Sequence, residues 1–556
     1  MDNNNNNYIV KELPVKYYLE HFQYLLSFLE KRYLHLLVKK EKRFIKNFRS
    51  LTEDAQCLYI RLVNRKSQFF KISGIKYDEI KNIRKSLKEL SKNKFIQFIK
   101  DDEIYYLKEV LTIHNKVDLI NIIKELKRYD NSLNKLTKED LIREICRIID
   151  LSKLLKSILE KNNIINILFK QEVKILQFIF FGNLEVNMSQ FVIKDIGNAF
   201  FEEFDEASFS PIFQNRKEVN QKLQALDIYE EFKKLREELT IINLYEWFKN
   251  KEKDFKKTYS ENVQQTYDKL FKKLGFKLEK EKLLDLALEV YSFCKSDLCR
   301  ERIVRIYLRQ KKKDLVIKLC DEILNNPQDQ EEYIFAQDFK ERVLKKSRKS
   351  TTTLLKKAET ILISNSFENH VENGVLNFFE KHGHQGFFSE NYLWNSLFGL
   401  IFWDILFEKV KHNPFQRAPS DLYINTFFIN KQEEFNKRIN EILDKDILFS
   451  IVERRYFEKY GIANSFVSWN NHLFEFVSKV IEKLAPLQLV IILKEMMKNL
   501  KSNTRGFPDL FIWDNENYFF IEVKSPNDKL SAQQLFWLEY FGKNNINAKV
   551  LRVKFT

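Results

Sequence analysis

Hydrophobic and polar positions near the carboxyl end of the chain follow a pattern that predicts a β-hairpin, a helix and a further strand. Leu510–Trp513 is a short apolar run suited to a buried strand, residues 514–517 are turn formers, and Tyr518–Lys524 resumes as a second strand. Apolar residues then recur at helical spacing between 530 and 541, and Ala548–Phe555 has the composition of another strand. This stretch therefore predicts an α/β domain.

Helical periodicity dominates the remainder of the chain. Residues 17–100 alternate amphipathic helices with short turns, and residues 104–150 hold two short helices. Long helices pair between 214 and 346, where 283–291 and 315–324 look like corresponding helices of a solenoid with an approximate repeat. We therefore expect a mostly α multidomain protein with an α/β domain at its carboxyl end.

Composition adds a charge bias to this picture. The 556 residues exceed what one core holds and indicate about three or four domains. The chain has 94 Lys+Arg against 78 Asp+Glu, and its net charge of +16 favours a polyanionic partner. Basic, Lys-rich chains are also common in AT-rich genomes, so this bias agrees with a nucleic-acid partner without proving one.

Two other classes of protein are disfavoured. The five cysteines lie apart and mostly within helical patterns, which indicates buried thiols in a reducing compartment and not disulfides or zinc ligands. No run reaches the roughly eighteen apolar residues that cross a membrane, and no signal peptide is visible. We expect no membrane partner.

Three charged residues of the predicted hairpin are expected to meet. Side chains alternate between the faces of a strand, so Glu522 and Lys524 share a face with Phe520, and the turn brings Asp509 beside them. Two carboxylates can hold Mg²⁺ or Mn²⁺, and a lysine can orient the attacking water and offset phosphate charge. Asp509, Glu522 and Lys524 therefore predict a metal-dependent phosphodiesterase.

Each part of this pattern also has a simpler explanation. A Pro-Asp followed by Glu-x-Lys occurs often by chance, and Glu522 with Lys524 is also what a solvated edge strand carries. Gln534, a polar residue on the apolar stripe of the next helix, is explained equally well as a satisfied core amide. The conjunction of the hairpin, the Ser-Pro-Asn-Asp sequence at 525–528, Gln534 and the basic chain favours a nuclease.

Longer strings then resemble one family. Residues 506–538 look like a VRR-NUC domain of the PD-(D/E)xK nuclease superfamily. Residues 51–71 and 77–80 resemble the amino-terminal DNA-binding region of the Fanconi-associated nuclease family, and so do 389–407 and 419–422. The similarity runs in the family's order from about residue 17 to the carboxyl end.

The resemblance implies roles for individual residues. Asp509 would bridge two Mg²⁺ or Mn²⁺ ions, with Glu522 and Glu390 completing their shells and the backbone carbonyl of Val523 as a further ligand. Lys524 would orient the nucleophilic water. The implied activity is 5′ flap endonuclease and 5′-to-3′ exonuclease cleavage of DNA in interstrand crosslink repair. Without the resemblance, Glu390 would be explained by helix capping.

Supporting residues follow from the same resemblance. Asp528 belongs to the family's Pro-Asn-Asp motif, where it caps the next helix, reaches the site through water, or does both. Lys501 and Gln533 match positions of a pocket for a terminal phosphate. Gln533 stands where relatives can have a lysine, which weakens that contact.

Basic clusters on the helical body are the candidate DNA contacts. Arg61, Arg65, Lys66 and Lys71 are expected to touch phosphates while Phe69 and Phe70 stay in the core. The alternative is a solvated helix face.

A second basic cluster lies in the solenoid region. The spacing of Arg302, Arg305 and Arg309 puts them on one helical face, and the family binds a terminal phosphate in this region. Here too a solvated basic face is the alternative.

The resemblance also divides the chain and names its partners. Animal relatives carry a ubiquitin-binding zinc finger, which needs clustered Cys and His that this sequence lacks. Expected partners are flapped or branched double-stranded DNA with 5′ ends and Fanconi-pathway or mismatch-repair proteins, in the nucleus. The expected divisions are a disordered Asn-rich tail (1–14), a helical DNA-binding region (15–103), a SAP-like module (104–155), a helical connector (156–213), a TPR-like solenoid with connecting helices (214–430) and the VRR-NUC domain (431–556).

Three other functions stay open at this point. One is a four-way-junction resolvase, which stand-alone VRR-NUC proteins can be, although the long helical body would obstruct symmetric docking. Another is a catalytically silent DNA-binding scaffold, and the last is a helical adaptor for proteins. Several phosphate contacts predict that DNA affinity falls steeply with salt, whereas an adaptor would not bind DNA.

Overall fold

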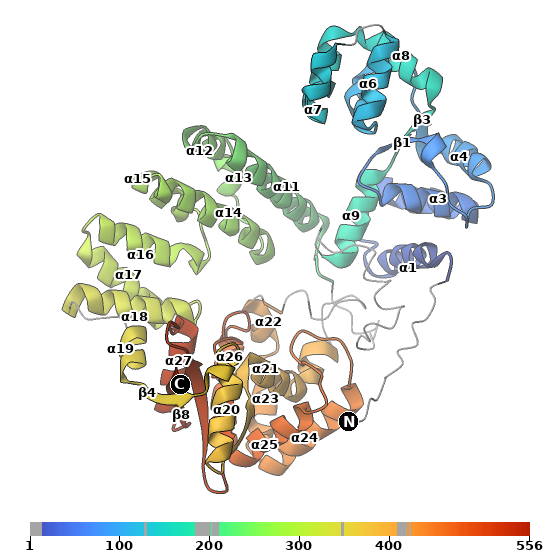
Figure 1. The fold of residues 1–556 in the computed structure, drawn as a ribbon. Helices are drawn as coiled ribbons and strands as arrows, with labels where there is room; N and C mark the ends of the chain where they lie inside the picture. The colour runs from blue at the N-terminus through green and yellow to red at the C-terminus, as the bar shows by residue number, and fades with distance from the viewer. Residues whose placement is uncertain are drawn as a thin grey trace. The chain divides into compact units, whose positions relative to one another are not determined.

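A computed structural model describes residues 14–126, 130–182, 211–345, 350–408 and 425–556, together with residues 184, 202, 419, 422 and 423 (Figure 1). The chain divides into two compact units, Met1–Asn198 and Ala199–Thr556. The expected tail at 1–14 lies outside the described residues except for its last position. No helix in the described part of the chain is long and apolar enough to span a membrane.

Unit 1 combines helices with a small antiparallel sheet. Strand β3 (Ile164–Ile167) lies between β1 (Phe69–Lys71) and β2 (Ile96–Phe98). The described helices of this unit are α1 (Tyr17–Arg32), α2 (Lys39–Arg49), α3 (Glu53–Val63), α4 (Ile83–Lys92), α5 (Leu107–Thr112), α6 (Lys116–Glu125), α7 (Lys138–Ile148), α8 (Leu151–Lys161) and α9 (Lys170–Phe181).

This sheet corrects the sequence analysis twice. β1 and β2 lie where only helices and turns were expected, and β3 lies in the expected helical connector at 156–213. Strands of three or four residues leave no periodicity to read, and their pairing partners stand up to about a hundred positions away. As predicted, Phe69 and Phe70 are buried.

Residues 104–161 form a helical group whose apolar core also includes Phe69, Ile99 and Ile164. Three of its helices, α6, α7 and α8, begin at residues that cap them: the side chains of Asn115, Thr137 and Asp150 each accept a hydrogen bond from the backbone amide three positions on. The two expected short helices are α5 and α6; α7 is a further helix within 104–150 that was not expected, and the SAP-like character of the group stays a prediction.

Unit 2 opens with a run of helices that pack in sequence (Figure 1). Successive partners are α11 with α14, α14 with α15, α16 with α17, and α17 with α18. The helices here are α11 (Arg216–Glu238), α12 (Ile241–Asn250), α13 (Glu252–Phe255), α14 (Glu261–Lys280), α15 (Leu284–Ser292), α16 (Arg300–Arg309), α17 (Lys313–Asn325), α18 (Gln330–Lys345) and α19 (Ser350–Lys357). The two helices expected at 283–291 and 315–324 are present as α15 and α17; a TPR-type repeat stays a prediction.

A mixed sheet follows in the order β4-β8-β7-β6-β5. The hairpin and last strand predicted from the sequence are confirmed as β6 (Leu510–Trp513), β7 (Tyr518–Lys524) and β8 (Ala548–Phe555). β4 (Glu359–Ile363) pairs with β8 in parallel, and β5 (Gln385–Phe388) pairs with β6 antiparallel.

The two added strands correct the expected domain limit. The fold that holds the hairpin begins before residue 431, because β4 and β5 belong to a region that the sequence analysis assigned to the solenoid and its connecting helices. Both strands join the sheet through pairing with residues more than a hundred positions away, which local periodicity cannot reveal.

Helices cover both faces of this sheet. α20 (Val371–Lys381) packs on the face that carries Ile521 and Val523, whereas α21 (Glu390–Ile401) and α27 (Ala532–Lys543) share the core of Phe520. The other helices of the domain are α22 (Asn425–Asn430), α23 (Gln432–Glu441), α24 (Lys445–Lys459), α25 (Leu473–Lys483) and α26 (Pro486–Lys498).

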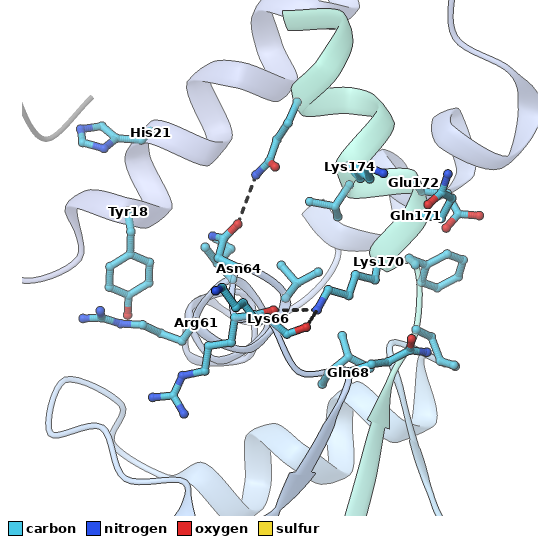
Figure 2. A pocket seen from close by; sticks show the side chains of 18 of the residues that line it. Tyr18, His21, Arg61, Asn64, Lys66, Gln68, Lys170, Gln171, Glu172 and Lys174 are labelled. Atoms are coloured by element: carbon cyan, nitrogen blue, oxygen red, sulfur yellow. Dashed lines mark hydrogen bonds between the residues drawn. The ribbon is translucent and has the colours of Figure 1, made fainter. Parts of the chain in front are cut away.

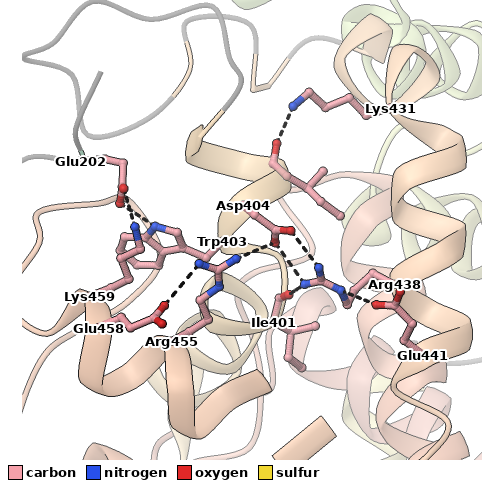
Figure 3. Close-up of polar contacts among 11 residues, drawn as sticks. Glu202, Ile401, Trp403, Asp404, Lys431, Arg438, Glu441, Arg455, Glu458 and Lys459 are labelled. Atoms are coloured by element: carbon pink, nitrogen blue, oxygen red, sulfur yellow. Dashed lines mark hydrogen bonds and ion pairs between the residues drawn. The ribbon is translucent and has the colours of Figure 1, made fainter. Parts of the chain in front are cut away.

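A polar cluster fixes the carboxyl end of α21 (Figure 3). Arg438 donates to the carbonyl of Ile401, the last residue of the helix, and its Nη2 lies 2.8 Å from Asp404 Oδ2. Arg455 approaches the same carboxylate at 3.8 Å. Burial raises the pKa of Asp404, but the arginines outweigh it and hold that pKa below its usual value. Beyond this point the chain continues as a π-helix, Asp404–Glu408.

Candidate active site

Strand pairing places Asp509 opposite Glu522. Leu510 pairs with Ile521 in the hairpin, so the residues before and after them meet at the same end of the two strands. The backbone amide of Val523 donates a hydrogen bond of 2.7 Å to Asp509 Oδ2. The convergence predicted from side-chain alternation is therefore present in the structure.

Glu522 and Lys524 are buried together on the Phe520 face. Glu522 is 1% exposed and Lys524 7% exposed, which rules out a solvated edge-strand pair. Lys524 Nζ lies 2.8 Å from Glu522 Oε1 as an ion pair. Apart from this contact, neither carboxylate oxygen of Glu522 has a polar partner among the described residues.

Burial and the charges of neighbouring acids raise the pKa of both carboxylates. Burial raises the pKa of Asp509 to about 7, against a hydrogen bond from Val523 and the charge of Lys524. Burial and then the charge of Asp509 raise the pKa of Glu522 to about 8. Acids whose pKa values are raised by burial and by neighbouring negative charge are typical of functional sites.

Glu390 stands at the edge of this pair. Its helix, α21, begins against the hairpin, because the backbone amides of Ser389 and Glu390 donate to the carbonyl of Asp509 at 2.8 and 3.3 Å. Ser389 Oγ also donates to the carbonyl of Pro508, at 2.9 Å. The Glu390 side chain is exposed, and its charge contributes to the raised pKa of Asp509 and of Glu522.

An aromatic stack holds the loop that leads to Asp509. The ring of Phe507 stacks on Trp537 at 4.1 Å and on Trp394 at 5.2 Å. Trp537 Nε1 donates to the carbonyl of Arg505 at 3.0 Å. α21 and α27 thereby clamp the residues on either side of Gly506.

Gly506 is required at its position for two reasons. Its φ of +83° lies in the left-handed region, and a Cβ there would stand 2.6 Å from the Cβ of Gln533. Gln533 thus packs against the loop before Asp509, while Lys501 is exposed before that loop. Terminal-phosphate binding by Lys501 and Gln533 stays a prediction.

The structure replaces two of the expected supporting roles. Gln534 is not an amide of the apolar stripe: it forms a capping box with Ser531 and accepts a hydrogen bond from that residue's amide. Asp528 does not cap α27; its carboxylate accepts hydrogen bonds from the Ser525 amide at 3.0 Å and hydroxyl at 2.6 Å, and its contact with the site through water stays a prediction. Asp528 therefore holds the turn that follows Lys524.

Glu372 is an acid that sequence reasoning missed. It lies at the start of α20, outside every motif, and its charge helps to raise the pKa of Asp509. Only the placement of α20 over the sheet brings it into range, so no local signal in the sequence could have identified it.

The residues present fit a divalent cation. No group of three His, Cys, Asp or Glu side chains in the described part of the chain forms a ready-made metal cluster. The structure brings Asp509 and Glu522 together and leaves Glu390 at the rim; the buried Glu522 carboxylate, which is ion-paired with Lys524, is available as a ligand. Carboxylate oxygens of this kind suit Mg²⁺ or Mn²⁺.

The arginines predicted to bind DNA in unit 2 are already paired. Arg302 makes a bidentate contact with Glu279 at 2.6 and 3.0 Å, and Arg309 reaches the same carboxylate at 3.1 Å. Arg305 lies 3.7 Å from Glu301. The shared helical face is confirmed, and DNA binding by Arg302 and Arg305 stays a prediction.

Comparisons with known proteins find similarity to one group of nucleases. Two family models match: "FAN1, HTH domain" over residues 16–97 and "VRR-NUC domain" over 446–555. Relatives called Fanconi-associated nuclease 1 homolog occur in Arabidopsis thaliana (22% identity, 97% of this chain, 67% of the relative) and Pseudomonas aeruginosa (24%, 97% and 96%). The chain thus carries matches to both family models and is similar over nearly its whole length to proteins named Fanconi-associated nuclease 1 homolog.

A solved structure shows that the family's fold extends over the chain. The crystal structure of paFAN1 bound to a 2-nucleotide 5′ flap DNA with a gap matches 98% of this chain and 100% of that one, with a TM-score of 0.79 and 23% identity. In the human family member, Fanconi-associated nuclease 1 of Homo sapiens, 29% identity covers 30% of this chain and 18% of the relative. The mostly α fold with a carboxyl-terminal nuclease domain is thereby confirmed.

Proposed function

We propose that the chain is a metal-dependent nuclease that cleaves flapped DNA near 5′ ends, as a 5′ flap endonuclease and 5′-to-3′ exonuclease. The observation that carries this proposal is the convergence of Asp509 with the buried ion pair of Glu522 and Lys524. The name of the family and the 5′ flap DNA bound to paFAN1 support the choice of substrate.

Asp509, Glu522 and the carbonyl of Val523 would hold the metal, with Glu390 able to add a carboxylate from the start of α21. A divalent cation, two ions in the proposal, supplies Lewis-acid stabilisation of charge on the scissile phosphate. The hydrogen bond from the Val523 amide fixes Asp509, and the clamp around Phe507 fixes the loop before it.

Lys524 would act on the water and the phosphate. Its ammonium group is held next to Glu522 in a buried site, where charge interactions are stronger than in water. From there it orients the attacking water, whose oxygen bonds to phosphorus as the bridging oxygen leaves with a proton. Burial of Glu522 and Lys524 also keeps bulk water out of the site.

The proposal extends to DNA binding and cellular role. Arg61, Arg65, Lys66, Arg302, Arg305 and Lys501 are the proposed DNA contacts, with the reservation that Arg302 already pairs with Glu279. Action in interstrand crosslink repair, in the nucleus and with Fanconi-pathway or mismatch-repair proteins, rests on the family resemblance alone.

The test is a comparison of substrates. The purified chain is incubated with Mg²⁺ or Mn²⁺ and one of four labelled DNAs: a 5′ flap, a 3′ flap, a four-way junction and a blunt duplex. The proposal expects cleavage near the junction of the 5′ flap that a chelator abolishes. Preferred symmetric cleavage of the four-way junction would identify a resolvase, and binding without cleavage would identify a scaffold; either would refute the proposal.

A further inference from the structure

Unit 1 contains a cavity of about 960 Å³ that the proposed mechanism does not use. Its walls come from α1, α3, the turn after α3, and the start of α9 (Figure 2). Pockets for small ligands span roughly 300–1,000 Å³, so the cavity can hold a group of nucleotide size.

One lysine, Lys170, holds the turn that lines part of this cavity. Lys170 Nζ donates to the carbonyl oxygens of Arg65, Lys66 and Ser67 at 2.6, 2.8 and 2.9 Å. The chain turns back toward them at Phe169, whose φ of +60° is rare for a bulky residue. Lys170 therefore fixes the turn that presents Arg65 and Lys66, and its own charge is committed to that turn.

Two cations of the wall are free to bind a ligand. Lys66 and Lys174 are exposed and have no ion-pair partner in the part of the chain that the structure describes. Arg61 is different, because its Nη2 lies 2.7 Å from Glu79. Glu172 is the acid among the described lining residues, so the cavity keeps a positive balance.

Aromatic rings and guanidinium groups alternate along another wall. The Arg61 guanidinium lies 4.1 Å from the ring centre of Tyr18 and 5.5 Å from that of Tyr77. Arg65 ends the series, 5.5 Å from the ring of Tyr77, and is exposed. The hydroxyl of Tyr77 is buried and has no hydrogen-bond partner among the described residues.

We infer that this cavity binds one unpaired nucleotide of a DNA single strand, with its phosphate between Lys66 and Lys174 and its base on the Arg65 guanidinium, within reach of the Tyr77 hydroxyl. A nucleotide can be bound by such groups: free cations contact its phosphate, a planar guanidinium stacks on its base, and an unpaired hydroxyl hydrogen-bonds to the base edge. An acidic peptide would use only the cations. A base inside a duplex is already stacked and paired and cannot enter. That the polymer is DNA rests on the proposed function.

The first test compares single-stranded and duplex DNA by fluorescence anisotropy, with the full chain in chelator so that nothing is cleaved. Lys66→Ala/Lys174→Ala should weaken binding of a short labelled oligothymidylate about tenfold and binding of a blunt duplex much less, because two phosphate contacts are lost. Lys153→Ala/Lys156→Ala removes the same charge from exposed positions of α8 outside the cavity and should change neither affinity appreciably.

The second test separates stacking from charge. Fluorescence of 2-aminopurine in a short single strand should be quenched by the wild type and by Lys153→Ala, but not by Arg65→Ala. Arg65→Lys keeps the charge without the planar group and should lose most of the quenching while retaining most of the affinity. Tyr77→Phe should weaken binding of the single strand and leave the duplex unchanged.

Two results would overturn the inference. Equal loss of single-strand and duplex affinity in the lysine variant would mean a general basic surface, and no loss would mean a ligand of another class, such as an acidic peptide. Cleavage is measured separately with metal present. If the wild type cleaves a 5′ flap but the cavity variants bind single strands with wild-type affinity, only the inference about the cavity is refuted. If the wild type does not cleave any of the DNAs, the proposed function is refuted.

Discussion

The amide of Val523 donates to Asp509 Oδ2 across the hairpin, at 2.7 Å. This bond ties the first acid of the site to the strand that carries the second acid and the lysine. A displacement of the loop before Asp509 would therefore act directly on the geometry of the candidate metal site.

Stability of the metal-free protein should fall as pH rises. The pKa values of Asp509 and Glu522 are raised to about 7 and 8, so the folded state binds more protons than the unfolded state from about pH 4 up to those values. Their contribution to stability is complete below the unfolded pKa values and is lost as pH rises through the folded ones. Urea melts in chelator from pH 5 to about 8.5 should show this loss, and Mg²⁺ should restore stability at the high end.

The matched variants for that measurement are Glu522→Gln and Glu516→Gln. Glu522→Gln removes one of the two carboxyl groups with a raised pKa. The stability of this variant relative to the wild type should therefore increase as pH increases. Glu516 is exposed in the turn of the same hairpin, and its replacement should leave the pH dependence as in the wild type. Parallel curves for all three proteins would contradict the raised pKa values.

Gly506→Ala should destabilise the protein and reduce cleavage. The new Cβ would meet Gln533 at 2.6 Å in a left-handed conformation that costs about 1 kcal/mol or more, and relief of the clash would shift Asp509. Gly542, in α27, has open space around it, and Gly542→Ala should be neutral or stabilising by up to about 1 kcal/mol. Chemical melts and cleavage rates of both variants make the comparison; equal behaviour would refute the packing argument.

Asp404→Ala should destabilise the domain that holds the site. It leaves Arg438 and Arg455 without the carboxylate they share, although each keeps a glutamate neighbour. Breaking a fully buried pair costs roughly 3–5 kcal/mol, and partial exposure of this one should make the loss smaller. The exposed pair on α25 supplies the control, since Glu482→Ala should cost less than about 1 kcal/mol in the same melts. Similar losses in both would contradict the proposed role of the cluster.

Local pattern was sufficient for the hairpin and for the convergence of Asp509, Glu522 and Lys524, because strand alternation and a short turn determine both. It was insufficient for β4, β5 and the sheet of unit 1, whose pairing joins distant segments. Glu390 was predicted as a metal ligand only from the family resemblance, because a glutamate at the start of a helix is ordinarily explained by capping. Glu372 required the placement of α20 over the sheet.

The roles of Gln534 and Asp528 show a further limit. A capping box reads Ser-x-x-Gln, and the sequence contains it at 531–534, but the apolar stripe around Gln534 favoured a core amide. Asp528 follows a strand and precedes a helix, and only the hydrogen bonds show that it serves the turn.

The most direct test of the central claim is the cleavage rate of a 5′-phosphorylated flap substrate in Mg²⁺ for Asp509→Asn, beside Glu516→Gln. The account predicts that Asp509→Asn folds, binds the flap with near wild-type affinity and loses cleavage by at least about a hundredfold, because the amide cannot replace a charged metal ligand. Glu516→Gln should cleave at the wild-type rate. Undiminished cleavage by Asp509→Asn would show that phosphodiester hydrolysis does not depend on this carboxylate.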